Sequence, residues 1–306
     1  MKKITVYIAL ALIIIIVGAV ALRPKSDTHM GTTGIYCGAD GKLSASKSIQ
    51  SHRSYCIKVS STAQDFLPNV PSAYSFTLVD DQGLVLKDLQ TEHEKLLHLI
   101  VARKDLGEFQ HVHPDFSTST GVFTLSNLKF PSAGDYRIFA DFTPTNAQIG
   151  TDGMPLPVIA YQDVTVRGAY APQPLGTVDT IKNVDGYTVS LTTNPQKLVS
   201  GTDMLSFAIV QNGKQVTDLE DYLGALGHSV VLKENTLDYI HTHAQEAPSS
   251  KQNGIITFHV EFPSAGNYKV FLQFKRGGAV ETVSFVVPIT TGGSNSTQEM
   301  NHSMHQ

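Results

Sequence analysis

The sequence predicts an all-β protein made of two tandem β-sandwiches, Ig-like or cupredoxin-like, preceded by one N-terminal transmembrane helix. Three observations support this prediction. The chain of 306 residues has no Trp but is rich in Val, Ile, Thr, Phe and Tyr, and β-branched and aromatic residues favour strands. Short alternating apolar runs are separated by turn residues, which is typical of a sandwich. The same motifs also occur twice, which indicates a duplicated unit.

The N-terminal segment predicts a membrane location. Met-Lys-Lys is followed by 19 uncharged residues, ITVYIALALIIIIVGAVAL. A run of this length spans a hydrocarbon core of about 30 Å as a helix, so residues 1–24 are predicted to be a single-pass anchor. The small residues Ala19 and Ala21 also fit a signal-peptide cleavage site, and a secreted protein is the alternative. Both interpretations place the remaining domains outside the cytoplasm.

The two cysteines, Cys37 and Cys56, follow this segment. In an oxidising compartment, a disulfide between them would close a loop of about 20 residues and contribute roughly 3 kcal/mol. Residues 25–54 are therefore predicted to be a juxtamembrane loop tied to the first domain. Free thiols and a metal-binding thiolate pair are the alternatives.

Matching motifs define the repeat. SFTLVDDQGLVLKDL matches SFAIVQNGKQVTDL, and FPSAGDYRIFADF matches FPSAGNYKVFLQF. The first sandwich is predicted over residues 55–166 and the second over residues 187–288. Residues 167–186 contain RGAYAPQPLGT, a Pro- and Gly-bearing linker. Residues 289–306 are predicted to be a flexible tail rich in Met and His.

Histidines recur at the same spacing, H-x12-H-x-H, in both units. In a hairpin whose turn centres on residues 104–105, His98 lies opposite His111, with Cβ atoms about 4.5–5.5 Å apart. His113 then projects from the same face. The second unit repeats this geometry about residues 234–235. The sequence therefore predicts one group of three imidazoles in each domain, formed by His98, His111, His113, His228, His241 and His243.

Three imidazoles so placed can bind one ion through metal–nitrogen bonds of about 2.0–2.1 Å. Imidazole suits zinc, copper, iron and nickel, and copper is the predicted ion, with zinc as the alternative. Thioether sulfur selects Cu(I), so the tail residues are predicted to be auxiliary ligands: His29, Met30, Met300, His302, Met304 and His305. A purely structural histidine cluster inherited by the duplication is the alternative to a metal site.

Other polar residues of the repeat carry less information. Asp141 follows the FPSAG motif of the first unit, but Gln273 stands in its place in the second, so it is not predicted to be a shared ligand. His93 lies on the opposite strand face from His98, and His259 has no partner in the other unit. Both are predicted to be surface residues.

Composition and missing motifs narrow the class of function. Only 16% of the residues are charged and the formal net charge is −4, which argues against a nucleic-acid partner. The sequence contains no GxSxG, P-loop, HExxH or post-strand GxGxxG motif. Two equal sites on a tandem module indicate binding capacity, so the protein is not predicted to be an enzyme.

The stretches LLHLIVARKDLGEFQHVHP and YLGALGHSVVLKENTLDYIHTHA, each followed by an FPSAG motif, resemble a group of bacterial secreted or membrane-anchored proteins. These are described as secreted or heavy-metal-binding-domain proteins and are associated with copper handling. The resemblance covers residues 55–288 and implies a tandem β-sandwich with a role in envelope metal homeostasis. The second motif ends in Ala244 where the first has Pro114, so the two sites are expected to differ there.

The predicted function is that of an extracytoplasmic, membrane-anchored copper-binding protein. Its predicted partners are the membrane, the metal ion and another envelope metal-handling protein. The alternative is a cell-surface interaction module that displays loops to a protein or glycan and whose histidines are structural.

Overall fold

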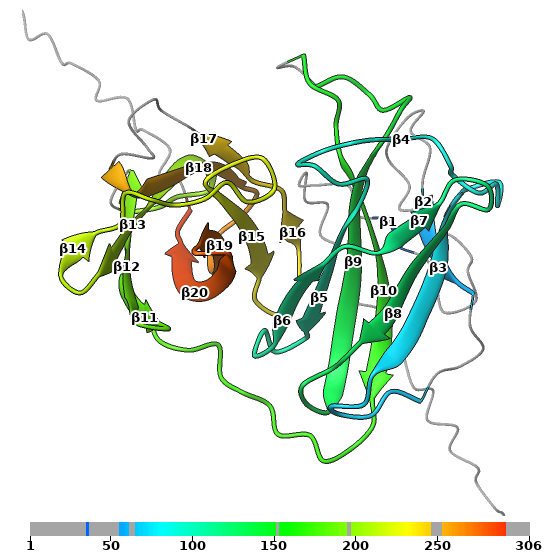
Figure 1. Cartoon of the computed structure of the whole chain (residues 1–306), viewed down its shortest axis with the longest axis horizontal. Helices are drawn as coiled ribbons and strands as arrows, with labels where there is room; N and C mark the ends of the chain where they lie inside the picture. Colours follow the sequence, from blue (N-terminus) through cyan, green and yellow to red (C-terminus); the bar gives the residue numbers. More distant parts are fainter. Residues whose placement is uncertain are drawn as a thin grey trace, which may run out of the picture.

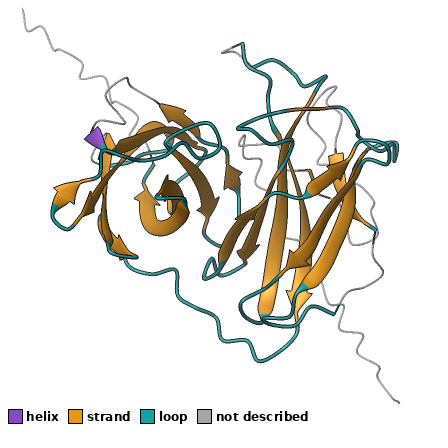
Figure 2. Ribbon diagram, in the orientation of Figure 1, coloured by secondary structure: helices purple, strands orange, loops and turns teal. Residues whose placement is uncertain are grey.

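The described part of the chain forms two β-sandwiches joined by residues 167–180 (Figures 1 and 2). All named elements are β-strands, which confirms the predicted all-β class. The predicted transmembrane segment, residues 1–24, lies outside the described residues, and within them no helix is long and apolar enough to cross a membrane. The computed structural model describes residues 35–36, 55–60, 65–150, 153–194, 197–245 and 253–291.

The first sandwich packs two sheets face to face. One sheet has the order β2-β3-β8-β7, with all neighbours antiparallel. The other has the order β1-β10-β9-β5-β6, with β4 beside β9. The bounds of these strands are β1 Ile35–Tyr36, β2 Tyr55–Val59, β3 Ser72–Asp80, β4 Leu89–Gln90, β5 His98–Arg103, β6 Phe109–Val112, β7 Asp115–Ser117, β8 Val122–Leu128, β9 Gly134–Pro144 and β10 Val158–Val166. Because β1 pairs in parallel with β10, part of the predicted juxtamembrane loop joins this sheet.

The second sandwich repeats this plan. One sheet has the order β11-β12-β13-β18-β17, with β14 beside β13, and the other has the order β16-β15-β19-β20. The bounds are β11 Ile181–Val184, β12 Tyr187–Asn194, β13 Gly201–Gln211, β14 Lys214–Gln215, β15 Gly227–Lys233, β16 Tyr239–Ile240, β17 His243–Gln245, β18 Ile255–Phe262, β19 Gly266–Arg276 and β20 Ala279–Ile289. The first of these strands lies inside the predicted linker 167–186, so the second sandwich begins at Ile181.

Each sandwich has its own apolar core between its two sheets. In the first, the rings of Phe76 and Phe123 stack with centroids 5.2 Å apart. In the second, Phe207 packs against Phe258 and Phe285 at 6.0 and 5.5 Å. Full burial of a side chain of this size stabilises a fold by about 1.5–3 kcal/mol. Each unit is therefore a domain with a hydrophobic core of its own.

The repeated FPSAG motif makes the same turn in both domains. The hydroxyl of Tyr136 donates to the carbonyl of Ser132 at 2.8 Å, and that of Tyr268 donates to the carbonyl of Ser264 at 2.7 Å. Such tyrosine corners are characteristic of immunoglobulin-like sandwiches. The glycine between them, Gly134 in the first domain, has φ +132, a backbone conformation that other residues rarely adopt. The motif thus sets the start of the long strands β9 and β19.

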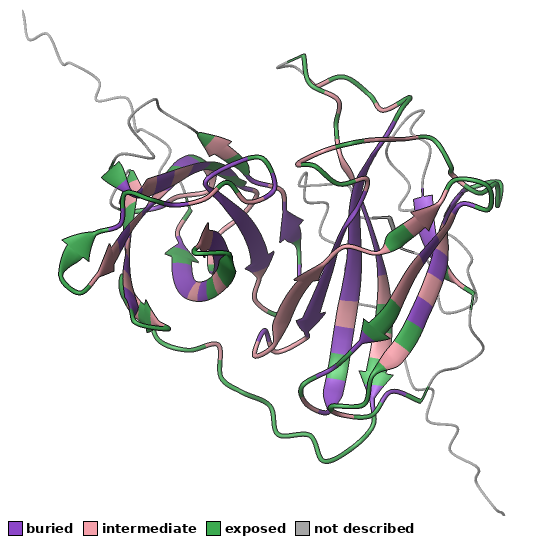
Figure 3. Cartoon of the chain, in the orientation of Figure 1, coloured by how far each residue is buried: buried purple, intermediate pink, exposed green. Residues whose placement is uncertain are grey.

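Strands β5 and β15 are buried over almost their whole length (Figure 3). A sandwich strand with one solvated face shows alternating burial, so continuous burial means that both faces are covered. One face packs on the domain's own core. The other contributes to a third apolar cluster that contains residues of both domains, including Ile100 and Val230. The two sandwiches therefore dock through these sheets (Figure 1).

The predicted hairpin register is wrong by one turn position in both domains. Leu99 pairs with Val112 and Val231 with Ile240, so the turns centre on residues 105–106 and 235–236. In the first turn the side chain of Asp105 accepts a hydrogen bond from the Gly107 amide at 2.9 Å, which stabilises this later reversal. The shift moves each partner by two residues. Because side chains alternate with a period of two, every histidine stays on its predicted face.

Candidate metal centre

The predicted ligands lie next to the apolar contact between the two domains. The ring of Phe109 stacks on Phe271 with centroids 4.1 Å apart, and Tyr239 lies against Phe139 at 5.4 Å. In the repeat, Phe109 corresponds to Tyr239 and Phe139 to Phe271. The two contacts are therefore reciprocal, and they define a pseudo-two-fold interface within one chain.

Polar contacts across this interface follow the same pseudo-symmetry. Nζ of Lys269 donates to the carbonyl of Leu106 at 2.9 Å. From the equivalent position in the first domain, Nη1 of Arg137 donates to the carbonyl of Thr236 at 3.5 Å. Each domain thus anchors a cationic side chain on the hairpin turn of the other. This fixes how the domains face each other and which histidines meet.

Four histidines of the two domains meet at this contact. Nδ1 of His98 lies 3.0 Å from Nε2 of His111 and 3.1 Å from Nε2 of His113. The ring centroid of His228, from the second domain, lies 4.8 Å from that of His111 and 5.3 Å from that of His98. One nitrogen each of His98, His111 and His228 lies within 4.8 Å of the other two. We call His98, His111, His113 and His228 the four-histidine centre.

Neighbouring carbonyl groups determine which ring nitrogens carry protons. Nε2 of His98 lies 3.1 Å from the backbone carbonyl of Glu92, and a carbonyl can only accept, so this nitrogen is the donor. Nδ1 of His111 lies 2.7 Å from Oε1 of Gln273 in the other domain. In this orientation of the side-chain amide, Nε2 of Gln273 donates to the hydroxyl of Thr282 at 3.1 Å, a group that can also donate. The tautomers of both histidines are thereby assigned from their acceptors.

The remaining nitrogens of these two rings face each other. With their protons on the opposite nitrogens, Nδ1 of His98 and Nε2 of His111 present lone pairs to one another across 3.0 Å. Two lone pairs at this distance repel, and a proton or a metal ion shared between the nitrogens removes the repulsion. An ion bound by both at about 2.0–2.1 Å holds its nitrogens roughly 2.9–3.4 Å apart for bond angles near 90–110°. The geometry therefore fits a shared metal ion.

Protonation of the centre is disfavoured. Burial, together with the neighbouring imidazoles His98 and His113, lowers the pKa of His111 to about 3. Burial and the charge of His98 lower the pKa of His113 to about 4. The pKa values of His98 and His228 are also lowered, chiefly by burial. Metal ligation requires neutral imidazole, so the four rings are in the correct state at neutral pH.

The corresponding half of the interface is built differently. Nδ1 of His241 lies 2.9 Å from Oδ2 of Asp141 in the first domain, and the hydroxyl of Tyr239 donates to the same oxygen at 2.9 Å. Burial acts to lower the pKa of His241, but the Asp141 carboxylate outweighs it and the net shift is upward. The pKa of Asp141 is lowered, because His241 overcomes the effect of burial. This half is a buried ion pair.

The six predicted ligands are thus divided unequally. His98, His111 and His113 come together as predicted, but His228 joins them instead of forming a second group with His241 and His243. Two separate and equivalent sites, one in each domain, are replaced by one centre shared between the domains. The reason is the docking of the sheets, which brings the start of β15 against the start of β5.

His93, predicted to be a surface residue, lies within the histidine cluster. Its ring centroid is 5.4 Å from that of His228, 6.0 Å from that of His98 and 6.1 Å from that of His241. It occupies a tight turn closed by backbone hydrogen bonds between Glu92 and Lys95, where its φ is 46°. No repeat signal marked it, because the equivalent residue in the second domain is Leu223.

The remaining predicted sites fall on the ends of the chain. Cys56 is disulfide-bonded, and Cys37, its predicted partner, lies outside the described residues. The auxiliary ligands of the two tails lie there as well: His29, Met30, Met300, His302, Met304 and His305.

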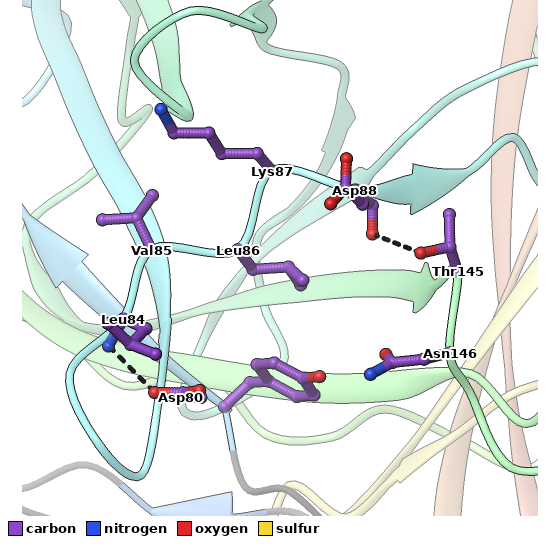
Figure 4. A pocket seen from close by; sticks show the side chains of 9 residues that line it. Asp80, Leu84, Val85, Leu86, Lys87, Asp88, Thr145 and Asn146 are labelled. Carbon is purple, nitrogen blue, oxygen red and sulfur yellow. Dashed lines mark hydrogen bonds between the residues drawn. The ribbon is translucent and has the colours of Figure 1, made fainter.

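A pocket of about 320 Å³ lies at one end of the first domain (Figure 4). It is lined by the loop after β3, residues 84–88, and by Thr145 and Asn146 after β9. The hydroxyl of Thr145 donates to the carbonyl of Asp88 at 3.4 Å, and the amide of Leu84 donates to the carboxylate of Asp80 at 2.9 Å. The bond from Thr145 joins the two loops, whereas that from Leu84 closes the turn after β3. The lining contains no residue of the four-histidine centre.

Fold and site together define a tandem β-sandwich protein with a histidine cluster at its domain interface. The chain belongs to the family described as a domain of unknown function, DUF8832, which matches residues 53–153 and again residues 182–291. The double match confirms the repeated domain organisation. The family description names no metal, so the resemblance to heavy-metal-binding proteins stays a prediction. A comparison with curated proteins finds no match.

Solved structures similar to this chain are distant. A Pseudomonas aeruginosa protein of the DUF4426 family has a TM-score of 0.29 and 11% identity, covering 38% of this chain and 100% of its own. The Escherichia coli adhesin FdeC has a TM-score of 0.23 and 15% identity, covering 78% and 66%. Invasin, a bacterial integrin-binding protein, has a TM-score of 0.24 and 15% identity, covering 79% and 40%. Similarities at this level do not bear on function.

Proposed function

We propose that this protein binds one first-row transition-metal ion per chain at the interface of its two sandwiches. The ligands are His98, His111 and His228, with His113 as the fourth imidazole. The observation that carries the proposal is the approach of Nδ1 of His98 to Nε2 of His111, 3.0 Å apart, which opposes two lone pairs in the tautomers assigned above. A bound cation relieves this repulsion. The same ion ties the two domains together, since His228 belongs to the second.

Copper is the proposed ion and zinc the alternative, because neutral imidazole suits both. The three ligand nitrogens lie within 4.8 Å of one another, whereas a tetrahedral ion with bonds of about 2.0–2.1 Å places them roughly 3.3–3.4 Å apart. Binding therefore requires the most distant ring to move inward by about 1.4 Å. His228 is the ring that moves, since Nδ1 of His98 and Nε2 of His111 already lie 3.0 Å apart.

We further propose that the protein acts outside the cytoplasm, anchored by residues 1–24, in envelope metal homeostasis. It would exchange its ion with another envelope metal-handling protein and catalyse no reaction. The apolar segment ITVYIALALIIIIVGAVAL, which is long enough to span a membrane, supports the location. Binding capacity rather than catalysis is supported by the crowded centre, in which His113 lies beside the three candidate ligands, with its Nε2 3.1 Å from Nδ1 of His98.

Titration of the full chain with Cu(II) and Zn(II) tests the proposal. His228→Ala and His111→Ala, which lie in different domains, are each expected to abolish the same tight ion. If the domains instead bound one ion each, His228→Ala would leave the ion of the first domain in place. Asp115→Asn, an exposed change just beyond His113, serves as the control and is expected to bind normally. Wild-type protein without an ion tighter than about micromolar would overturn the proposal.

A second measurement separates a metal centre from a structural histidine cluster. In a purely structural cluster the Gln273 amide is reversed, and His111 donates through Nε2 to His98. Nitrogen-15 NMR of the metal-free protein distinguishes the two tautomers of His111 directly. A proton on Nδ1 is expected for the metal centre, and a proton on Nε2 would favour the structural cluster.

A further inference from the structure

The second domain carries an exposed pair of imidazoles that the histidine repeat does not explain. His243 of β17 and His259 of β18 are directly opposite each other in the antiparallel register. Both are exposed, whereas Phe258 and Val260 on either side of His259 are buried in the core. The pair therefore lies on the outer face of the sheet. Directly opposed residues have Cβ atoms about 4.5–5.5 Å apart, a separation from which two imidazoles can bind one ion.

His259 is not a relic of the duplication. Its counterpart in the first domain is Asn127, since Phe262 corresponds to Phe130 in the repeated FPSAG motif. The first domain has no equivalent pair, because Asp115 opposes Thr124 where its own two strands meet. The exposed pair is thus particular to the second domain, where His259 stands opposite His243, the histidine that the repeat supplies.

A continuous series of imidazoles connects this pair with the four-histidine centre. The ring centroid of His243 lies 4.9 Å from that of His241. His241 lies 6.1 Å from His93. His93 in turn lies 5.4 Å from His228 and 6.0 Å from His98. Neighbouring rings of the series thus have centroids no more than 6.1 Å apart.

Burial and charge both change along this series. His243 and His259 are exposed, the side chain of His241 is 16% exposed, and His228 is 8% exposed. The buried carboxylate of Asp141, 2.9 Å from Nδ1 of His241, lies midway along the series. Its charge is offset while His241 is protonated, and it acts on an arriving ion once His241 releases its Nε2 proton to solvent and offers that lone pair. Fixed negative charge in a buried position attracts a cation more strongly than it would in water. An ion bound at the surface is therefore drawn inward.

We propose that His243 and His259 form a second, weaker metal site, which captures the ion from solution and loads the four-histidine centre through His241 and His93. This inference rests on the proposed function, because it assumes a tight ion at that centre. The ligand class is a hydrated divalent first-row ion, for which two imidazoles replace two waters. The open coordination positions keep the site exchangeable, unlike the buried centre.

The test uses the full chain with Cu(II) alone, and compares wild type with the double variant His243→Gln, His259→Gln. Titration followed by visible absorption is expected to show a tight ion and a weaker one in wild type. In the double variant the tight ion remains and the weaker one is lost. Stopped-flow mixing is expected to show that the fast phase of loading of the tight site is lost in the double variant, because the ion then enters without the exposed imidazole pair.

Glu261→Gln is the matched control, since Glu261 is exposed on the same strand and the same face as His259. It removes a charge but no imidazole, and is expected to load like wild type. The loading site alone would be overturned if wild type, the double variant and Glu261→Gln all bound the tight ion at equal rates and all kept the weaker ion. Wild type without a tight ion would overturn the proposed function itself, so the two failures are distinguishable.

Discussion

The two halves of the domain interface use the same scaffold for different chemistry. In one half, His111 of the first domain is oriented by the amide of Gln273 of the second. In the other, His241 of the second domain is oriented by the carboxylate of Asp141 of the first. Gln273 and Asp141 occupy equivalent positions of the repeat. A neutral acceptor leaves His111 with a free lone pair, whereas a charged acceptor holds His241 as its ion-pair partner.

This difference explains how a symmetric duplication can produce one centre instead of two. After docking, both halves offer a histidine whose Nδ1 meets an acceptor across the interface. Only the half that contains Gln273 has an uncharged acceptor and three further imidazoles close to its histidine, His111. The half with the carboxylate is already compensated by its own histidine and by the hydroxyl of Tyr239. The exchange of one side chain therefore assigns ligation to one half and charge pairing to the other.

The largest expected effect follows from removing the carboxylate. Asp141→Ala leaves His241 and the Tyr239 hydroxyl buried without their acceptor. The loss of one partner of a buried ion pair typically costs about 3–5 kcal/mol. Urea unfolding of the metal-free protein is expected to show a decrease of this size in the free energy of unfolding. Asp141→Asn keeps an acceptor oxygen but removes the charge, so it is expected to lose nearly as much; a clearly smaller loss than in Asp141→Ala would contradict the ion pair.

A smaller effect is expected on the other half. Gln273→Leu removes the acceptor for Nδ1 of His111 and releases its tautomer, and loss of such an orienting partner typically lowers metal affinity by about 10–100-fold. Competitive titration with a chelator measures this change. Gln273→Glu keeps an acceptor at the same place and is expected to restore His111 Nδ1 protonation, as seen by nitrogen-15 NMR. Unchanged affinity in Gln273→Leu would exclude a positioning role.

His111 and His241 are expected to contribute to the pH dependence of stability with opposite signs. The pKa of His111 is about 3 in the folded protein, below the ordinary value of about 6.5. The unfolded chain therefore binds more protons, and this histidine reduces stability as the pH falls from about 6.5 toward 3. The pKa of His241 is raised, so its pairing stabilises the fold below about pH 6.5 and is lost as the pH rises through the folded-state value.

Each of these protons changes the free energy of unfolding by at most about 1.4 kcal/mol per pH unit. Urea unfolding of the metal-free protein between pH 4 and pH 8 measures it. His111→Gln is expected to flatten the loss of stability toward acid, and His241→Gln is expected to steepen it. The same change in both variants would show that the two halves are not distinct.

Much of the fold follows from local features of the sequence. The repeated FPSAG motif places a tyrosine corner before β9 and β19, and alternating apolar residues assign the strands that line each core. The parity of the histidine spacing survives a wrong turn position, because a shift of the partner by two residues leaves every side chain on the same face. The continuous apolar runs after His98 and His228 carried a further signal, since a strand buried on both faces needs a second partner.

The sequence by itself determined which histidines lie on one face of each hairpin, because strand periodicity is a local property of the backbone. Only the tertiary structure decided that His228 joins the histidines of the first domain, that Asp141 and Gln273 reach across to the other domain, and that His93 enters the cluster. These contacts depend on how two apolar sheet faces dock. That docking is a property of surfaces assembled from residues more than 100 positions apart, such as His111 and Gln273, and no spacing along the chain records it.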